Sequence, residues 1–223
     1  MSRSVPLVFD LDGTLIDSAP DLHATANAVL GQEGLPPVSL SQLRSYIGNG
    51  VQHLVGCLLR SANRPETGPQ QERVLAAYVA RYEQAVTLTY PYPGVRAALE
   101  TLQRAGHRMA ICTNKPMVAT MSVLNHLKMA DFFDVVVAGD SLPQRKPDPA
   151  PLRLALARLG GAPALYIGDS EVDAATAQAA EMPFLLFTEG YRKGPVDAMR
   201  HVAAFADFGQ LPVIIAQLKA EMA

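Results

Sequence analysis

The first strand-forming segment of this chain is followed at once by two acidic residues. Val5–Phe9 is a short, almost entirely apolar run that ends at Asp10, and Asp12 lies two positions further on. A run of this length with β-branched and aromatic side chains predicts a strand buried on both faces, as in a parallel sheet. We therefore expect both carboxylates at the carboxyl edge of a buried sheet.

Four later segments repeat the apolar pattern, and helical patterns precede them. Val95, Leu99 and Leu102 recur at i, i+4 and i+7, which predicts a helix that Gly106 ends. A similar spacing over 152–159 predicts another. Strands that alternate with helices indicate an α/β fold. The four further strands are expected at Met109–Cys112, Phe133–Val137, Leu165–Ile167 and Phe184–Phe187.

Between the first two strands lies a long segment, about residues 18–90, with helical patterns and no convincing strand. Ser18 with Asp21, and Ser39 with Gln42, have the spacing of capping boxes. Helices are also predicted by apolar residues at helical spacing, namely Val51, Leu54, Val55, Leu58, Leu59, Val74, Tyr78 and Tyr82.

A helical insert of this length is most simply a second, smaller domain. The chain of 223 residues suits one domain that carries an insert, and it returns to the α/β pattern through the stiff turn at Pro91–Gly94. We predict a Rossmann-like parallel sheet core, formed by residues 1–16 and 91–223. An all-helical cap domain is predicted over residues 17–90.

Composition excludes several kinds of partner and site. Lys and Arg number 19 and Asp and Glu 21, so the chain lacks a broad cationic surface for polymeric nucleic acid. No apolar run has the length of a signal peptide or of a membrane span. Cys57 and Cys112 stand alone in apolar stretches, so we expect buried, reduced thiols and a cytoplasmic protein.

Chemically useful side chains gather where the predicted strands end. Ligands of open parallel sheets bind outside the carboxyl ends of the strands, at the place where the strand order reverses. Groups from separate motifs are therefore expected to converge on one crevice. They are Asp10, Asp12, Thr113, Asn114, Lys146 and Asp169.

This set of groups suits phosphoryl transfer. Carboxylates this close repel each other, and Mg²⁺ is the natural cation to neutralise them. Asp10 can then attack phosphorus and form an aspartyl-phosphate, because the metal and Lys146 withdraw charge from the phosphoryl oxygens. Asp12 is placed to protonate the leaving alkoxide and later to deprotonate the attacking water. Thr113 and Asn114, with backbone N–H groups of the loop 11–14, would hold the transferring oxygens.

Taken singly, these residues have ordinary structural explanations. Asp10 and Asp12 suit a turn, and Ser170 suits the N-cap of a helix. Lys146 alone would be a solvated surface charge. Asp173 is explained equally well as a catalytic support and as a first-turn acid that complements a helix dipole. The combination of the motifs favours a catalytic site.

The combination resembles the haloacid dehalogenase superfamily of phosphatases with an aspartate nucleophile. The match in motif order and spacing extends from Val5 to about Arg192. This resemblance implies that Asp10 is the nucleophile and Asp12 the acid and base. It also implies that Mg²⁺ is bound by Asp10, by the backbone carbonyl of Asp12 and by Asp169. The matching motifs are Phe9–Ser18, which contains Gly13 and Thr14, then Cys112–Pro116, Arg145–Pro149 and Gly168–Asp173.

Within that superfamily, further segments are similar to the phosphoglycolate phosphatases. They lie at residues 17–22, 92–95 and 139–143. The similarity implies hydrolysis of 2-phosphoglycolate to glycolate and phosphate, within carbohydrate metabolism. It also implies that a cap loop of Gly48, Asn49 and Gly50 reaches the active site, whereas the residues alone suggest a turn between helices. After Tyr191 this chain has Arg192, where that family more often has Asn.

Two other functions stay open on the sequence. One is a sugar-phosphate phosphatase, phosphomutase or pyrophosphatase of the same superfamily. The other is a phospho-accepting signalling module, which Asp12 and the helical insert argue against. The expected partner is a small phosphorylated metabolite, and the oligomeric state is not predicted. Candidates to bind a substrate carboxylate are Arg44, Arg60, Arg64 and the Asn49 loop.

Overall fold

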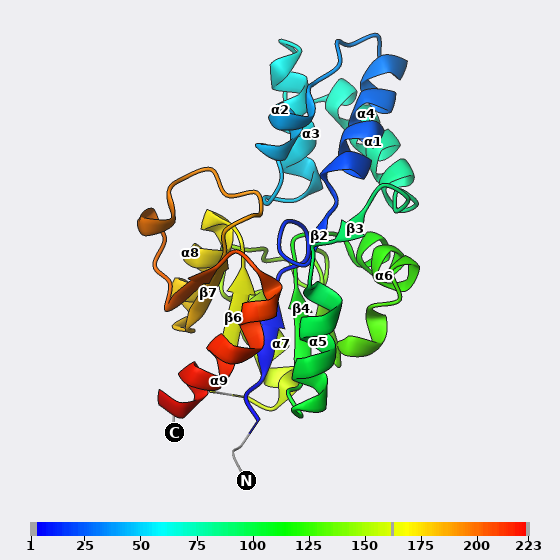
Figure 1. Cartoon of the computed structure of the whole chain (residues 1–223). Helices are drawn as coiled ribbons and strands as arrows, with labels where there is room; N and C mark the ends of the chain where they lie inside the picture. Colours follow the sequence, from blue (N-terminus) through cyan, green and yellow to red (C-terminus); the bar gives the residue numbers. More distant parts are fainter. Residues whose placement is uncertain (1–3, 162, 222–223) are drawn as a thin grey trace.

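A six-stranded parallel sheet forms the centre of the computed structural model, which describes residues 4–161 and 163–221 (Figure 1). The strand order is β5-β4-β1-β6-β7-β8. In the middle, β1 (Leu7–Phe9) pairs with β4 (Met109–Cys112) on one side and with β6 (Leu165–Gly168) on the other. The strand order therefore reverses at β1, where a crevice forms beside the carboxyl ends of the strands.

Helices bury both faces of the sheet. Leu7 and Phe9 of β1 pack into one apolar cluster with side chains of α5, α6 and α9. Val8, which points the other way, packs with side chains of α7 and α8. Because both faces are covered, the strands are apolar throughout.

The remaining core elements have these bounds. The other strands are β5 (Val135–Val137), β7 (Phe184–Phe187) and β8 (Ala203–Phe205). The helices are α5 (Val95–Arg104), α6 (Met117–His126), α7 (Ala150–Leu159), α8 (Glu171–Ala180) and α9 (Leu211–Glu221). Short 3-10 turns are η1 (Ala130–Phe132), η2 (Val196–Ala198) and η3 (Phe208–Gln210).

The predicted α/β core and helical insert are confirmed, with differences at single elements. Every predicted strand is present, although β5 begins at Val135 because the chain is still leaving η1 at Phe133. Strand β8 was not predicted, because it is an edge strand in which only Phe205 is buried and its apolar signal is weak. Nor was a short antiparallel pair predicted, β2 (Ile16–Asp17) and β3 (Tyr90–Pro91), at the two ends of the insert.

Four helices between β2 and β3 form the cap, which lies above the sheet in Figure 1. Their buried side chains, such as Leu58 and Tyr78, form an apolar cluster of their own, as the spacing predicted. We propose that the cap is residues 17–90, because the β2–β3 pair stands at both junctions. The predicted core ranges include residues 1–3, 162 and 222–223, which lie outside the described residues. The cap helices are α1 (Ala19–Gln32), α2 (Leu40–Arg44), α3 (Val51–Ser61) and α4 (Pro69–Tyr82).

One of the two predicted capping boxes forms. The hydroxyl of Ser39 accepts a hydrogen bond from the backbone N–H of Gln42, and the backbone N–H of Ser39 donates to Gln42 Oε1. The box of Ser18 and Asp21 is wrong. Asp21 accepts the hydroxyl of Thr89 at 2.6 Å, and the hydroxyl of Ser18 donates to a carboxylate outside the helix. Both side chains thus hydrogen-bond to residues outside the helix, and they do not form the predicted capping box.

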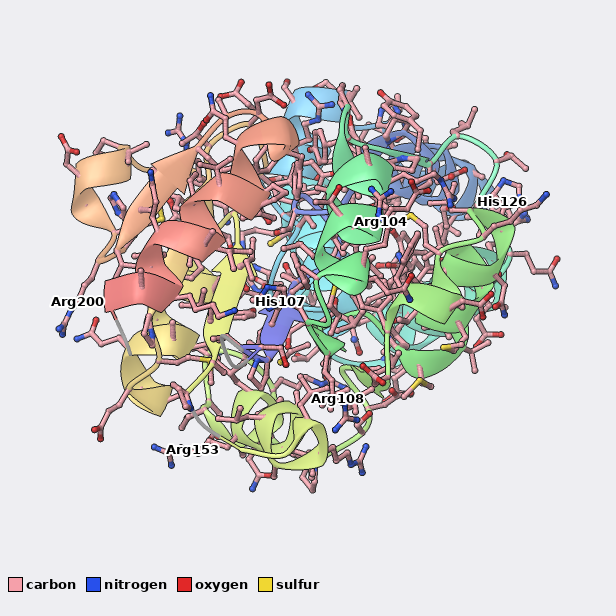
Figure 2. All side chains as sticks on the ribbon, turned by 60° about the horizontal axis from the view of Figure 1, so that its bottom comes forward. Arg104, His107, Arg108, His126, Arg153 and Arg200 are labelled. Atoms are coloured by element: carbon pink, nitrogen blue, oxygen red, sulfur yellow. The ribbon has the colours of Figure 1, made fainter. Side chains whose placement is uncertain are left out.

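The end of the sheet away from the cap carries exposed basic side chains, which Figure 2 labels. Arg108 lies 3.6 Å from Asp134 in an ion pair, and both line a shallow hollow with Asp131. Acidic neighbours therefore balance part of the positive charge there. The arginines labelled in Figure 2 are all exposed, namely Arg104, Arg108, Arg153 and Arg200.

Three further observations concern cysteines, histidines and helix length in the described residues. Cys57 and Cys112 are buried and free, as expected. No histidine belongs to a candidate metal-binding group within the described residues, and His107 is buried with Nδ1 2.8 Å from the carbonyl oxygen of Val5. In the same part of the chain, no helix is long and apolar enough to cross a membrane.

Candidate active site

Several of the predicted site residues line a pocket between the sheet and the cap, and Asp169 lies at the same edge of the sheet without being among the lining residues described. Asp10 follows β1, Thr113 follows β4 and Asp169 follows β6, so three neighbouring strands deliver them to one edge of the sheet. The space inside the pocket is about 450 Å³ when the open solvent at its mouth is included. Its core side is lined by Asp10, Asp12, Thr113, Asn114, Lys115 and Lys146.

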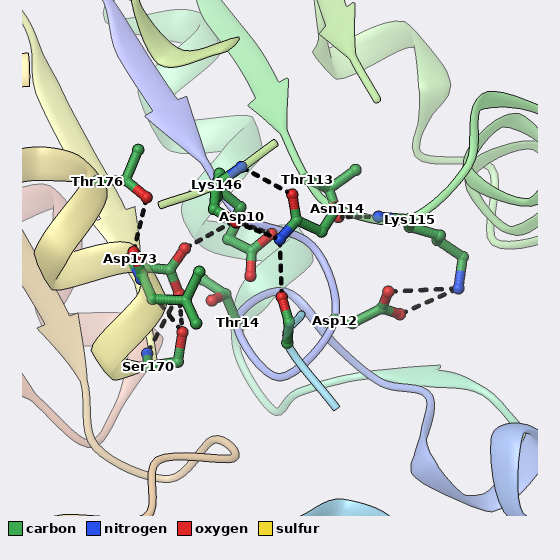
Figure 3. A network of polar contacts seen from close by, with 12 residues as sticks. Asp10, Asp12, Thr14, Thr113, Asn114, Lys115, Lys146, Ser170, Asp173 and Thr176 are labelled. Carbon is green, nitrogen blue, oxygen red and sulfur yellow. Dashed lines mark hydrogen bonds and ion pairs between the residues drawn. The ribbon is translucent and has the colours of Figure 1, made fainter. Parts of the chain in front are cut away.

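Lys146 is buried between two carboxylates (Figure 3). Its Nζ lies 2.8 Å from Asp10 Oδ1 and 2.7 Å from Asp173 Oδ1. The same ammonium donates to the hydroxyl oxygen of Tyr166 at 3.0 Å, and that hydroxyl donates to Asp173 at 2.6 Å. All three strong donors of Lys146 are thus committed to this cluster.

Asp173 contacts both the start of a helix and Lys146. It is the N3 residue of a capping box with Ser170 at the start of α8. Its Oδ2 accepts the hydroxyl of Ser170 at 2.6 Å, while its Oδ1 holds Lys146. Asp173 therefore caps the N-terminus of α8, where a negative charge complements the helix dipole, and holds Lys146 in position.

Asp169 is held from two distant segments. The hydroxyl of Thr14 donates to Oδ1 at 2.6 Å, and the backbone N–H of Tyr191 donates to Oδ2 at 2.6 Å. Gly13 has φ +88°, and a Cβ there would lie 2.5 Å from Asp169 Oδ2. A Cβ on Gly190 would lie 2.4 Å from the same oxygen. Both glycines allow the backbone to approach this carboxylate.

Asp10, Asp169 and Asp173 form a group of carboxylates whose candidate ligand atoms all lie within 4.8 Å of one another. Burial and the charge of Asp173 raise the pKa of Asp10 to about 7, against the attraction of Lys146. Burial and the charges of Asp173 and Asp10 raise the pKa of Asp169 well above its usual value. Burial also opposes ionisation of Asp173, but Lys146 and the hydrogen bonds outweigh it and lower that pKa.

Asp12 lies on the other side of the pocket, beside Lys115 (Figure 3). Lys115 Nζ is 3.1 Å from Asp12 Oδ1 and 3.4 Å from Oδ2, and the hydroxyl of Ser18 donates to Oδ1 at 2.6 Å. Lys115 also donates to the hydroxyl of Tyr82 on cap helix α4 at 2.5 Å. The Asp12 side chain is outside the carboxylate group around Asp169, so only its backbone carbonyl stays a candidate metal ligand.

The side chain of Asn114 joins three segments instead of pointing freely into the pocket. Its Nδ2 donates to the carbonyls of Gly48 and Lys146, each at 2.9 Å, and its Oδ1 accepts the backbone N–H of Lys146. The hydroxyl of Thr113, which is buried, accepts the backbone N–H of Lys115 at 3.2 Å. Asn114 thus holds Lys146 beside the glycine loop, which consists of Gly48, Asn49 and Gly50.

The glycine loop reaches the pocket through two of its three residues. Gly48 and Gly50 line the pocket and have φ values of +114° and +84°, whereas Asn49 is not among the lining residues described. The cap side of the pocket is otherwise apolar or aromatic. It consists of Leu22, Ile47, Val51, Leu54, Tyr78 and Tyr82.

The predicted arginines of the cap do not line this pocket. Arg44 lies 2.8 Å from Asp17, and Arg60 pairs with Glu66 at the surface. Arg64 is exposed. None of these three guanidinium groups is therefore among the side chains that line the pocket.

Several residues that shape the site escaped the sequence analysis. Tyr166 and Tyr82 are buried. Because a buried tyrosine hydroxyl needs a hydrogen-bond partner, a tyrosine predicted to be buried could have indicated a nearby polar group. Lys115 was noted only as part of a motif. The hydroxyl of Tyr191 donates to Asp17 at 2.7 Å and accepts the backbone N–H of Ser18, and no local pattern points to it.

Comparison with known proteins agrees with this geometry. Residues 7–187 match the sequence profile of the family described as haloacid dehalogenase-like hydrolase. The chain belongs to this family. The resemblance of the motifs is thereby confirmed, and so is the fold that it implied.

Several similar proteins match nearly the whole chain. Phosphoglycolate phosphatase of Rhodobacter capsulatus is 49% identical over 94% of this chain and 95% of its own length. The enzyme of the same name from Cereibacter sphaeroides is 47% identical over 96% and 99%. The crystal structure of a predicted phosphoglycolate phosphatase from Haemophilus somnus has a TM-score of 0.90 at 29% identity, and the match covers 96% of this chain and 99% of that one. The protein is therefore an enzyme of the phosphatase type.

The close approach at Asp169 gives a prediction for stability. Gly190→Ala should lower the free energy of unfolding by about 1–3 kcal/mol, because its Cβ would lie 2.3 Å from the Gly13 carbonyl oxygen. Gly31→Ala is the matched control, since a Cβ there meets nothing within 4 Å in helix α1. It should raise stability by up to about 1 kcal/mol. Urea denaturation measures both, and equal stability of the two variants would contradict the tight fit.

Proposed function

We propose that this haloacid dehalogenase-like phosphatase hydrolyses 2-phosphoglycolate to glycolate and phosphate, with Mg²⁺ as cofactor and an aspartyl-phosphate on Asp10. The observation that carries the proposal is the buried contact of Asp10 with Lys146, at 2.8 Å, at the base of a pocket that also contains Asp12. The near full-length similarity to phosphoglycolate phosphatases supports the choice of substrate.

The carboxylate group fits a divalent cation. Three buried carboxylates cannot all ionise at low cost, and the raised pKa values of Asp10 and Asp169 express that conflict. A hard cation with oxygen ligands would relieve it. Asp173 is already saturated by Lys146 and Ser170, so we assign the metal to Asp10, Asp169 and the backbone carbonyl of Asp12. When bound, Mg²⁺ withdraws negative charge from the phosphoryl oxygens.

In the first step, a carboxylate oxygen of Asp10 attacks phosphorus, and the bond from phosphorus to the bridging oxygen breaks. Asp12, in its protonated form, gives its proton to that oxygen, so that glycolate leaves as the alcohol. The positive charge of Lys146, whose N–H donors stay with Asp10, Asp173 and Tyr166, and the hydroxyl of Thr113 would stabilise the negative charge on the phosphoryl oxygens.

In the second step, water attacks the phosphorus of the aspartyl-phosphate. Asp12, now ionised, takes the proton of the water, and the bond between phosphorus and the Asp10 oxygen breaks to free phosphate. The apolar wall of the cap excludes other water from the pocket while this happens. One carboxyl group thus moves protons in both directions.

The partner in this proposal is a small phosphorylated metabolite, and the place of action is the cytoplasm. Two free, buried cysteines agree with a reducing compartment. Sugar phosphates and pyrophosphate are the alternative substrates of the same chemistry. A phospho-accepting signalling module is disfavoured by Asp12, whose position in the pocket suits release of phosphate.

Two substitutions test the assigned roles. Asp10→Asn should abolish turnover and leave no phosphorylated protein. Asp12→Asn should lower kcat about 10²–10⁴-fold on 2-phosphoglycolate, as expected for loss of a general acid. With p-nitrophenyl phosphate, whose leaving group needs no proton, Asp12→Asn should accumulate phosphoprotein visible by intact-protein mass spectrometry. Retained turnover in Asp10→Asn would reject the nucleophile.

A substrate panel tests the specificity. Phosphate release with and without Mg²⁺ should be fastest, by kcat/KM, on 2-phosphoglycolate, and slower on hexose phosphates and pyrophosphate. A higher kcat/KM on hexose phosphates would reject 2-phosphoglycolate as the preferred substrate and would leave the proposed reaction mechanism unchanged. A stable phosphoprotein with negligible phosphate release would favour the signalling module.

The raised carboxyl pKa values predict how Mg²⁺ binding depends on pH. Protons compete with the cation at Asp10, whose pKa is about 7 without metal, so the rise in Tm on adding Mg²⁺ should be small at about pH 5 and larger at about pH 8. Thermal unfolding with Mg²⁺ and with a chelator at each pH measures the difference. Asp10→Asn should flatten this dependence, and a pH-independent effect in the unaltered protein would contradict the assignment.

A further inference from the structure

Two ammonium groups line the active-site pocket within the described part of the chain, and they occupy different sides of it. Lys146 is committed to Asp10, Asp173 and Tyr166. Lys115 stands beside Asp12 on the other side and is 3% exposed. The mechanism proposed above uses Lys146 for the phosphoryl group and gives no role to Lys115.

The proposed substrate carries a second anion that needs a cation. Residues 17–90 contain no lysine, and the arginine Arg44 is held by Asp17 while Arg60 is held by Glu66. The cap side of the pocket presents apolar and aromatic side chains together with glycines. A carboxylate placed there would lose its solvation unless a charged donor faced it. Lys115 is the donor in position.

The position of Asp12 fixes where such a carboxylate would lie. Asp12 must reach the oxygen that bridges phosphorus and the CH₂ group of 2-phosphoglycolate. The carboxyl carbon is two bonds beyond that oxygen. Lys115 Nζ is 3.1 Å and 3.4 Å from the two oxygens of Asp12, and Asp12 must contact the bridging oxygen. A carboxylate two bonds from that bridging oxygen is therefore within reach of Lys115 Nζ.

The ammonium of Lys115 also has the donor capacity for it. An ammonium has three N–H donors. The hydroxyl of Tyr82 takes one at 2.5 Å, and the two contacts to Asp12 belong to one carboxylate. One donor remains for a ligand in the pocket. The ring of Tyr82, with its centroid 4.3 Å from Nζ, holds the ammonium in place from the cap side.

We infer that Lys115 binds the carboxylate of the substrate and so determines the preference for an acidic phosphomonoester. The inference rests on the proposed function and adds a specificity-determining residue to it. Two merely structural roles give different results: Lys115 as a support for Asp12 alone, and Lys115 as a latch between the core and Tyr82 of the cap. Both would affect all substrates alike, whereas a carboxylate site affects only substrates that carry the charge.

The test compares two substrates that differ in that charge, 2-phosphoglycolate and 2-hydroxyethyl phosphate. For Lys115→Met, the ratio of kcat/KM for the acidic over the neutral substrate should fall about 10- to 100-fold, the range for loss of a charge-assisted hydrogen bond. Most of the fall should appear in KM for 2-phosphoglycolate. Lys115→Arg should restore part of the ratio because it keeps the charge. Lys115→Gln is measured in parallel in case the Met variant does not fold.

Two control variants separate the alternatives. Tyr82→Phe removes the acceptor on the cap and should change kcat/KM for both substrates by the same factor. Lys128→Gln removes an exposed lysine outside the pocket and should leave both values unchanged. Equal losses on both substrates in Lys115→Met, or an unchanged ratio, would overturn the inference while the proposed function stands. If the unaltered enzyme does not prefer 2-phosphoglycolate to the neutral ester, the proposed substrate and this inference both fail.

Discussion

The active site depends on one buried ammonium group among three buried carboxylates. Lys146 contacts Asp10 and Asp173 directly, and Asp169 completes the group within 4.8 Å. Buried charges persist only where they are paired and hydrogen-bonded. The surrounding loops meet that requirement from distant parts of the chain, since Thr14 supplies a hydroxyl and Tyr191 a backbone N–H. The positions of these loops therefore follow from the need to hold three carboxylates close together.

The parts that the sequence predicted are those whose physical cause is local. A strand buried on both faces is apolar along its whole length, so β1 was recognisable, and Asp10 followed from the strand end. The spacing of Leu58 and Tyr78 predicted the buried faces of the cap helices for the same reason. Lys146 is the exception, because a lone lysine in a loop carries no local signal and only the ordered set of motifs pointed to it.

The parts that the sequence missed are contacts between distant residues. Asp21 bonds to Thr89, which lies 68 positions away, and this long-range partner replaced the predicted cap with Ser18. Tyr191 reaches Asp17 across 174 positions, so no pattern within one helix or strand reveals it. These hydrogen bonds form only when the sheet and the cap are assembled, so a local sequence pattern does not predict them.

The β2–β3 pair has a consequence for how such an enzyme diversifies. The two ends of the cap are hydrogen-bonded neighbours, with Ile16 opposite Pro91. An insertion that closes where it opened places little strain on its host, and its length adds only slowly to the entropy of closure. The proposed cap therefore connects to the core at one place. Descendants with a roomier or tighter apolar wall can arise by change within residues 17–90, while the groups that cleave the ester are inherited unaltered.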